Sequence, residues 1–205
     1  MSLREQQTEM ARKLVASAAL DAFREDGYVG TTMTGVAERA GVARQTVYNL
    51  FESKAALLIA AIGDRVEGAE QRSQDSDHQA IREADSPEEM IELFARSSAG
   101  IAERALPVLR IAYEAAAIDS EVEKQLLINE EHRYQVQSFF IDTLDEKGFL
   151  RTDIPTAELK RGFWLLASPH NLLTAHQAGW DTATYTTWLT QTVQGLLLPP
   201  PQGSP

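Results

Sequence analysis

Residues 31–54 read TTMTGVAERAGVARQTVYNLFESK, and this stretch predicts two short helices joined by a tight turn. Gly41 lies between the two helices, and glycine readily takes the left-handed backbone conformation that such a turn needs. Val36 before the turn and Val47 after it have the helical spacing of residues that face one core. The stretch therefore predicts a helix-turn-helix, the motif that places its second helix in the major groove of DNA.

The polar side of the second predicted helix carries side chains that can read bases. Arg44 can hold guanine through a forked pair of hydrogen bonds, and Gln45 can pair with adenine in a similar way. Thr46 can meet thymine through its methyl or hydroxyl group. These three residues are therefore the predicted base-reading residues.

The same stretch and its flanks resemble the tetracycline-repressor (TetR) family of bacterial regulators. The resemblance rests on several short motifs together, namely Gly27-Tyr28, Thr31-Thr32, Ala37-Glu38-Arg39-Ala40-Gly41-Val42, Val47-Tyr48-Asn49-Leu50-Phe51, Ser53-Lys54 and Leu57. Two positions depart from the family pattern. Gly35 stands where an acidic residue usually completes a capping box, and Ala43 stands where Ser or Thr usually caps the second helix. Neither departure removes a residue that faces the groove.

The resemblance implies an all-α fold, with an N-terminal three-helix DNA-binding domain and a C-terminal helical domain for ligand binding and dimerisation. It implies a homodimer that binds a double-stranded DNA operator as a repressor and is released by a small-molecule effector. It also implies phosphate contacts by Thr32, Tyr48, Asn49 and Lys54. Lys54 lies in the first turn of a predicted helix, where free backbone N–H groups also favour an anion. The alternative for Tyr48 and Asn49 is that they are exposed polar residues on a core helix.

Composition narrows the possible classes of function. The 205-residue chain is 43% hydrophobic, which is enough for a core, and it has no cysteine, which excludes disulfides, zinc fingers and thiol catalysis. No apolar run approaches the roughly 20 residues of a membrane span. The first residues lack a hydrophobic signal segment. We therefore expect a cytoplasmic protein with no membrane partner.

The net charge of −11 is unevenly distributed along the chain. Residues 1–60 hold seven basic and seven acidic residues, so the whole excess of acid lies in residues 61–205. An acidic surface weakens non-specific binding to DNA. We therefore expect the acidic part of the chain to face away from DNA.

Periodicity and capping signals predict helices over the rest of the chain. The predicted helices are 8–26, 33–40, 44–50, 53 to the low seventies, 87–103, 105–118, 120–147, 156–179 and 181–198. Residues 71–86 are polar and predict either a mobile connection or a frayed helix end. We divide the chain into a DNA-binding domain over 1–52, a ligand-binding and dimerisation domain over 53–198, and a disordered tail over 199–205.

Large side chains on different predicted helices are candidates for lining a small-molecule pocket. They are Phe94, Leu109, Tyr113, Phe140 and Trp164. The alternative for each is an ordinary core residue. Arg110, Asn129 and Arg133 could orient a polar ligand, or the two arginines could belong to a solvated helix face. The aromatic candidates and the acidic charge of this half favour a neutral or cationic apolar ligand over a polyanion.

The segment Ser168-Pro169-His170 interrupts a helix that is otherwise predicted to run from 156 to 179. Proline removes one internal hydrogen bond and bends a helix, which opens backbone carbonyls and leaves room for a cavity. His170 lies at the bend. It is either a further ligand-binding residue or a structural histidine.

The last two predicted helices carry apolar stripes that could pack against a second copy in a four-helix bundle. The candidate interface residues are Phe163, Leu166, Leu173, Trp188, Leu189 and Leu196. The alternative is burial within one chain. Because a helix-turn-helix generally reads paired half-sites, we favour the dimer.

Two other classes of function compete with a DNA-binding regulator. An all-helical enzyme lacks support, because the sequence has no pair of Glu-x-x-His motifs for a di-iron centre, no His-Glu-x-x-His and no phosphate loop. No cofactor or metal is expected for the same reason. The remaining alternative is a helical adaptor or binding protein that does not read DNA.

Overall fold

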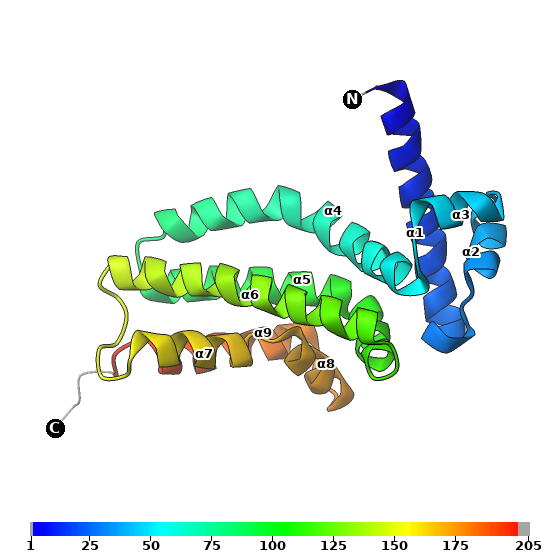
Figure 1. Ribbon diagram of the computed structural model, residues 1–205. Helices are drawn as coiled ribbons and strands as arrows, with labels where there is room; N and C mark the ends of the chain where they lie inside the picture. Colours follow the sequence, from blue (N-terminus) through cyan, green and yellow to red (C-terminus); the bar gives the residue numbers. More distant parts are fainter. Residues whose placement is uncertain (1, 201–205) are drawn as a thin grey trace. The chain divides into compact units, whose positions relative to one another are not determined.

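The computed structural model describes the backbone of residues 2–200 and the side chains of residues 2, 4–63 and 79–200. Over residues 2–200 the chain forms nine α-helices and no β-strand, which confirms the predicted all-α fold (Figure 1). The helices are α1 (Leu3–Gly30), α2 (Met33–Ala40), α3 (Arg44–Leu50), α4 (Lys54–Glu83), α5 (Pro87–Ala116), α6 (Ser120–Glu146), α7 (Thr156–Leu166), α8 (Pro169–Gln177) and α9 (Thr182–Leu197).

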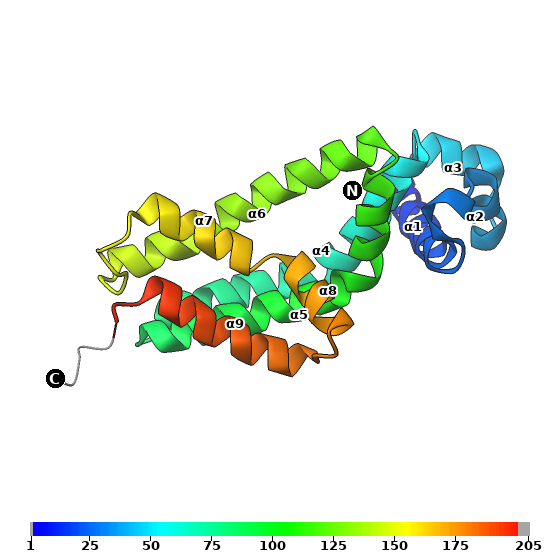
Figure 2. The same ribbon diagram turned by 90° about the horizontal axis from the view of Figure 1, so that it is seen from below.

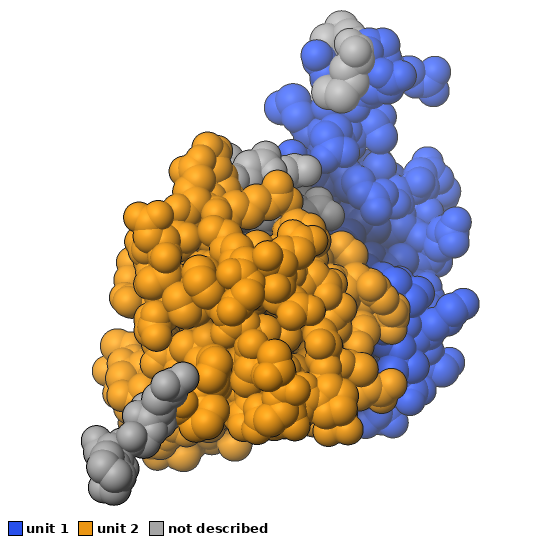
Figure 3. All heavy atoms as spheres, turned by 90° about the vertical axis from the view of Figure 1, so that its left-hand side faces the viewer, with its two compact units in different colours: residues 1–69, 104–128 blue, residues 70–103, 129–205 orange. Residues whose placement is uncertain are grey.

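The chain divides into two compact units, which Figure 3 colours separately. Unit 1 comprises Met1–Ala69 and Arg104–Ile128, and unit 2 comprises Glu70–Glu103 and Asn129–Pro205. Helices α4, α5 and α6 each contribute residues to both units. The sequence predicted a domain boundary after residue 52, between DNA binding and ligand binding. That boundary concerns function and not compactness, and it stays a prediction.

A continuous apolar core holds unit 1 together. Val36 and Val47, one on each side of the predicted turn, are both fully buried. The core also includes residues from the α4, α5 and α6 segments of this unit, among them Leu57, Leu58, Val108, Ala112, Ala115 and Val122. The helix-turn-helix is therefore packed on the same core as the first half of α4.

Helix α1 is longer than the predicted helix over 8–26, and its end has a distinct geometry. Gly27 interrupts the helical backbone with a φ of 68°, a value that glycine takes at little cost. The Thr31 hydroxyl and backbone N–H both donate to the Gly27 carbonyl oxygen, at 2.8 and 3.2 Å. The short turn after Gly27 turns Tyr28 inward, where only 6% of its surface is exposed.

The structure corrects the prediction of two separate helices over 87–103 and 105–118. Both belong to the single helix α5, and Pro107 lies inside it. Proline removes one hydrogen bond from a helix interior. Its neighbours Ala105 and Val108 are buried, so packing against the core keeps the helix continuous.

The predicted connection over residues 71–86 is also shorter than expected, because α4 continues to Glu83. Glu, Gln and Arg are good helix formers, so the polarity of this stretch misled the prediction. Residues 199–200 have no regular secondary structure, and residues 201–205 of the predicted tail lie outside the described residues.

In unit 2 the predicted helix over 156–179 is broken rather than bent. Helix α7 ends at Leu166 and α8 begins at Pro169, which is a favoured first residue of a helix. The Asn171 side-chain amide donates to the carbonyl oxygens of Leu165 and Leu166, at 2.8 and 3.0 Å. These bonds satisfy carbonyls that the end of α7 leaves without helical partners.

Helices α6 and α7 run side by side within unit 2 (Figures 1 and 2), and an ion pair of 2.7 Å joins Lys160 Nζ to Asp142 Oδ1. Helix α9 packs on α7 through a buried stripe of Tyr185, Leu189, Val193 and Leu197. Along residues 2–200, no helix whose side chains are described has the combined length and apolar character of a bilayer span.

Candidate nucleic-acid interface

The turn between α2 and α3 has the geometry that the sequence predicts. Gly41 adopts a left-handed conformation with a φ of 66°. Its N–H donates to the Glu38 carbonyl at 3.2 Å, and the Val42 N–H donates to the Ala37 carbonyl at 3.1 Å. These two bonds close the end of α2. Helix α3 then starts three residues after Gly41.

The two departures at the helix starts have different consequences. The Thr32 hydroxyl accepts a bond of 3.0 Å from the Gly35 N–H, so α2 keeps one half of a capping box. Gly35 has no side chain to complete the other half. Ala43 makes no side-chain cap, so α3 begins without one. Thr32 is exposed, but its hydroxyl already caps α2.

Helix α3 presents its polar side chains to solvent. Val47 anchors the helix and is fully buried, while Arg44, Gln45 and Asn49 are exposed. Tyr48 is 44% exposed, so its ring and hydroxyl are both accessible to a partner. Thr46 is half-buried. This face therefore has the side chains needed for contacts to base edges and phosphates.

Two contacts within α3 order this face. The Arg44 guanidinium carbon lies 5.7 Å from the centre of the Tyr48 ring, within the range of a cation–π interaction. The Gln45 side-chain amide donates to Asn49 Oδ1 at 2.9 Å. Both pairs have i, i+4 spacing and so lie along the helix.

Lys54 has close contacts within the chain. Its ammonium group donates to the Tyr28 carbonyl oxygen at 2.7 Å and lies 4.3 Å from the centre of the Tyr28 ring. These contacts hold the start of α4 against the end of α1. A phosphate contact by Lys54 remains a prediction, and it would compete with the bond to Tyr28.

A polar link connects the end of α1 to the start of α6, both inside unit 1. The Tyr28 hydroxyl donates to Asp119 Oδ2 at 2.6 Å, and Asp119 Oδ1 accepts from the Glu121 N–H at 3.0 Å. Beside it, the Ser53 hydroxyl donates to Glu121 Oε2 at 2.9 Å. One carboxylate therefore caps α6 and fixes Tyr28 at the same time.

This arrangement moves the pKa values of both groups. The hydrogen bond from Tyr28 is the main cause that lowers the pKa of the Asp119 carboxyl group. Burial, followed by the bond to Asp119, raises the pKa of the Tyr28 hydroxyl. Both shifts favour a neutral tyrosine donating to an ionised carboxylate.

Removing the Tyr28 hydroxyl should destabilise the protein. Tyr28→Phe keeps the ring contacts with Phe23 and Lys54, but it removes a bond to a charged acceptor. We expect the free energy of unfolding to fall by about 1–2 kcal/mol at pH 7. Because the pKa of Asp119 is lowered in the folded state, this contribution is present above the ordinary pKa of about 3.9 and is lost as the pH falls below it.

Urea unfolding of wild type and Tyr28→Phe at pH 7 and near pH 3 measures this difference. Tyr48→Phe is the matched control, because the Tyr48 side chain is 44% exposed. Removing its hydroxyl should leave the free energy of unfolding unchanged. A Tyr28→Phe variant as stable as wild type at pH 7 would show that the link contributes nothing.

In unit 2 three aromatic rings form one cluster. The ring centres of Phe94 and Phe140 are 4.6 Å apart, and that of Phe163 lies 4.8 Å from Phe94 and 5.4 Å from Phe140. Phe94 and Phe140 also line a cavity of about 20 Å³, which has room for about one water molecule. The structure therefore brings together two of the six predicted pocket residues, beside a cavity too small for a drug-sized ligand.

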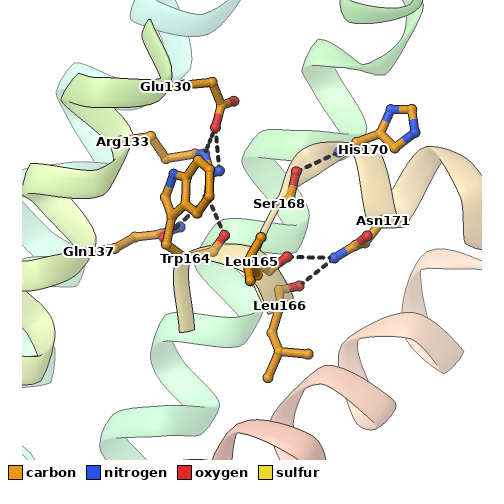
Figure 4. A network of polar contacts seen from close by, with 9 residues as sticks. All are labelled: Glu130, Arg133, Gln137, Trp164, Leu165, Leu166, Ser168, His170 and Asn171. Carbon is orange, nitrogen blue, oxygen red and sulfur yellow. Dashed lines mark hydrogen bonds and ion pairs between the residues drawn. The ribbon is translucent and has the colours of Figure 1, made fainter. Parts of the chain in front are cut away.

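A polar network surrounds Trp164, a third predicted pocket residue (Figure 4). The Arg133 guanidinium donates to the Trp164 carbonyl at 2.8 Å and to Gln137 Oε1 at 3.2 Å, and it also pairs with Glu130. Its carbon lies 4.9 Å from the Trp164 ring centre. With its side chain only 17% exposed, Arg133 is not part of a solvated helix face. Arg110, by contrast, forms an exposed pair with Glu114.

The Trp164 indole N–H is buried and has no hydrogen-bond partner among the described residues. Buried polar groups without a partner are uncommon and need an explanation.

Leu109 and Tyr113 are half-buried and belong to unit 1, whereas Trp164 and the exposed His170 belong to unit 2. Among the residues with described side chains, no group of His, Asp and Glu could hold a metal ion.

Comparison with known proteins places these observations in a family. Residues 15–61 match the model of the bacterial regulatory proteins of the tetR family. Over 51 residues the chain is 43% identical to the HTH-type transcriptional regulator RutR of Escherichia coli, and this match covers 25% of the chain and 24% of RutR. The helix-turn-helix segment of the chain is therefore similar to that of the TetR family. The matched part is about a quarter of the relative's length, so the sequence match concerns the helix-turn-helix region.

Solved structures extend the TetR likeness to the whole fold. A protein from Mesorhizobium loti assigned to the TetR family aligns with a TM-score of 0.72 at 18% identity, over 92% of this chain and 96% of the other. SmeT, solved in complex with triclosan, aligns with a TM-score of 0.71 at 17% identity, over 93% and 92%. A transcriptional regulator from Saccharomonospora viridis, solved with choline, aligns with a TM-score of 0.72 at 17% identity, over 94% and 100%.

The TetR fold leaves two of the predicted dimer residues inside one chain. Phe163 is 0% exposed and Leu189 is 1% exposed, so neither side chain has surface left for a partner. Leu166, Leu173, Trp188 and Leu196 are half-buried. Leu165, which is not among the predicted interface residues, is 60% exposed on α7. The apolar stripe predicted burial, but it did not distinguish the chain's own core from a second copy.

Three further residues around the TetR helix-turn-helix were not selected from the sequence. Tyr28 and Asp119 form the link described above, across 91 positions of the chain. Arg12 on α1 donates to the carbonyl oxygen of Leu50 at 3.0 Å, across 38 positions. Tyr28 belonged to a recognised motif, but no local pattern indicated the partners of these side chains.

Proposed function

We propose that this TetR-family chain is a DNA-binding transcriptional regulator, acting in the cytoplasm as a homodimer and releasing its operator when a small molecule binds. Repression is the form of control we propose. The observation that carries the proposal is the exposed polar face of α3, held on the buried Val47 and the Gly41 turn. A helix of this kind fits the major groove with its first residues at the base edges.

Within this proposal the residues of α3 have separate roles. Arg44 and Gln45 lie in the first turn and read bases, together with Thr46. Tyr48 and Asn49 contact phosphates and set the register of the helix on the duplex. Helix α3 in unit 1 carries the reading residues, and the acidic excess of residues 61–205 lowers affinity for random DNA.

Binding to DNA from the promoter of the chain's own gene tests the proposal. We expect a complex that survives an excess of unrelated competitor DNA. Arg44→Ala should weaken that complex by about 1–3 kcal/mol, the contribution of a forked contact to a base. Fluorescence anisotropy with labelled promoter fragments measures the difference.

Arg96→Ala is the matched control for this measurement. Arg96 lies on α5 with its side chain 67% exposed and pairs with Glu92, so its removal changes net charge by the same amount. It should leave operator affinity almost unchanged. Equal losses for the two variants would show that charge, and not base reading, accounts for the effect of Arg44.

The proposed effector site lies around Trp164 in unit 2. Its indole N–H needs an acceptor, and the Tyr134 ring, whose centre lies 6.4 Å from that of Trp164, offers apolar contact. We therefore propose a neutral or cationic apolar effector that carries a hydrogen-bond acceptor. The complexes of SmeT with triclosan and of the Saccharomonospora viridis regulator with choline support a small-molecule site in proteins of this fold. The cavity of about 20 Å³ is lined by Phe94 and Phe140 and not by Trp164, so space for such a molecule must open at the indole itself.

Trp164→Phe tests the role of the indole N–H, because it keeps an aromatic ring and removes the donor together with the second ring of the indole; compounds without an acceptor report the effect of the lost ring alone. A thermal-shift screen of neutral and cationic apolar compounds against wild type supplies the ligands. We expect Trp164→Phe to bind the compounds that carry an acceptor about tenfold more weakly, as expected for one lost hydrogen bond. Affinity for operator DNA should stay unchanged. A variant that binds every compound as wild type does would place the site elsewhere.

Control of DNA binding requires that the effector favour one arrangement of the helices over another. Helix α6 begins in unit 1, where Asp119 caps it and holds Tyr28, and it continues into unit 2, where it carries Arg133. We propose that α6 transmits the change from Trp164 to the end of α1. A shift in the separation of the two reading helices, away from one turn of DNA or about 34 Å, would then release the operator.

A further inference from the structure

We infer that Arg12 is a positioning residue for the DNA-reading helix. Its guanidinium lies at the C-terminal end of α3, where Nη1 donates to the Leu50 carbonyl oxygen at 3.0 Å. The guanidinium carbon also lies 4.6 Å from the centre of the Phe51 ring. The inference rests on the proposed function, because it assigns Arg12 to orienting a helix that reads DNA.

Helix α3 needs support from outside. It has only seven residues, and isolated helices of that length do not persist in water. Its N-terminal end has no side-chain cap, since Ala43 stands there. Stability must therefore come from the buried Val47 and from the C-terminal end.

Arg12 supplies that support at the C-terminal end. The last carbonyls of a helix have no partner within it, and a cation there also interacts favourably with the helix dipole. The Phe51 N–H closes the last turn on the Val47 carbonyl at 2.9 Å. Leu50 is the last residue of α3, and Arg12 donates a hydrogen bond to its carbonyl oxygen.

The support comes from a fixed part of unit 1. Arg12 lies one turn before Val15 and Ala16, which α1 buries in its core with 0% and 2% exposure. Phe51, under the guanidinium, is 2% exposed. The contact therefore ties the end of α3 to α1 about one turn after Val47, and it limits the tilt of the helix that carries Arg44 and Gln45.

Arginine suits this role better than lysine does. A planar guanidinium can stack on the Phe51 ring and donate to a carbonyl at its edge at the same time. An ammonium group is a compact, strongly hydrated charge and cannot do both in one plane. A lysine at position 12 would keep the positive charge but not the stacked geometry. Comparing arginine with lysine at this position therefore distinguishes a positioning role from a simple attraction to phosphate.

Arg12→Lys and Arg12→Met test the inference, with Lys13→Met as the matched control. Lys13 is the neighbouring cation, its side chain is 64% exposed, and it pairs only with Glu9 among the described ion pairs. Binding of the full-length variants to the promoter fragment is measured as a function of salt. Hydrogen exchange of the backbone amides of residues 48–51 is measured without DNA.

A positioning role predicts the same behaviour for both Arg12 variants. Each should bind the promoter fragment about five- to tenfold more weakly, with the salt dependence unchanged, and each should exchange the α3 amides severalfold faster. Lys13→Met should leave the exchange unchanged. A direct phosphate contact predicts that Arg12→Lys binds as wild type does, while Arg12→Met lowers the slope of log K against log salt by about 0.9. That result, or unchanged amide exchange in both variants, overturns the inference.

The exchange measurement also separates this inference from the proposed function. If wild type binds no promoter DNA, the proposed function fails. Faster exchange in both Arg12 variants would still establish the cap on α3, and unchanged exchange would remove it.

Discussion

Leu165→Glu is expected to convert the proposed homodimer into monomers and to weaken operator binding by about 100-fold. Leu165 is 60% exposed on α7, one residue before that helix ends, so its side chain is available to a second copy. A carboxylate at an apolar interface loses its hydration without gaining a partner. Two linked DNA-binding domains bind paired half-sites about 10²–10⁴ times more tightly than one domain binds a single half-site. Loss of the dimer therefore removes most of the binding.

Light scattering and fluorescence anisotropy on the same samples measure both effects of Leu165→Glu. Leu127→Glu is the matched control, since Leu127 is 65% exposed on α6 and lies in unit 1. The control should remain dimeric and bind as wild type does. If wild type is itself a monomer at micromolar concentration, the dimer is refuted.

Phe163→Ala is expected to lower the free energy of unfolding by about 3–5 kcal/mol, the usual result of removing a large ring from a core. Phe163 is 0% exposed and packs against both Phe94 and Phe140. No repacking of the two remaining rings can fill the whole space, so a cavity should remain.

Urea unfolding of Phe163→Ala, beside Leu165→Ala on the same helix, checks this expectation. The Leu165 variant should change stability by less than about 0.5 kcal/mol in monomeric protein, because an exposed side chain buries little area on folding. If Phe163→Ala keeps its stability but dissociates the dimer, Phe163 is an interface residue, as the sequence suggested.

The helix-turn-helix could be predicted from the sequence because its determinants are local. Gly41 marks the turn by its backbone freedom, and Val36 and Val47 mark the buried sides of the two helices. The exposure of Arg44 and Gln45 follows from the burial of Val47 on the same short helix. All of this information lies within about 20 residues.

The interior of the second half could not be predicted equally well. Periodicity identifies an apolar face, but it does not say which element covers that face, as Phe163 and Leu189 show. The sequence predicted a break at residue 104, but α5 is continuous there and through Pro107, whose neighbours pack in the core. At Pro169 the same residue type does end a helix, because Ser168 and Asn171 satisfy the exposed backbone groups.

Contacts between distant parts of the chain were beyond the reach of sequence patterns. The Tyr28–Asp119 bond and the Arg12–Leu50 bond each depend on how α1 packs in unit 1. A single sequence gives the chemistry of these side chains and not their partners. Lys54 illustrates the difference, since its contacts with Tyr28 were visible only in the structure.

Selection of binding sites from a pool of random DNA duplexes tests the central claim, that α3 of this chain reads operator sequence. Wild type should enrich paired half-sites with two-fold symmetry, with centres about one helical turn or a multiple apart. Arg44→Ala should enrich the same paired sites, but with the preference lost at one base pair of each half-site. Enrichment of no common sequence by wild type, or an identical preference in both proteins, would contradict the account.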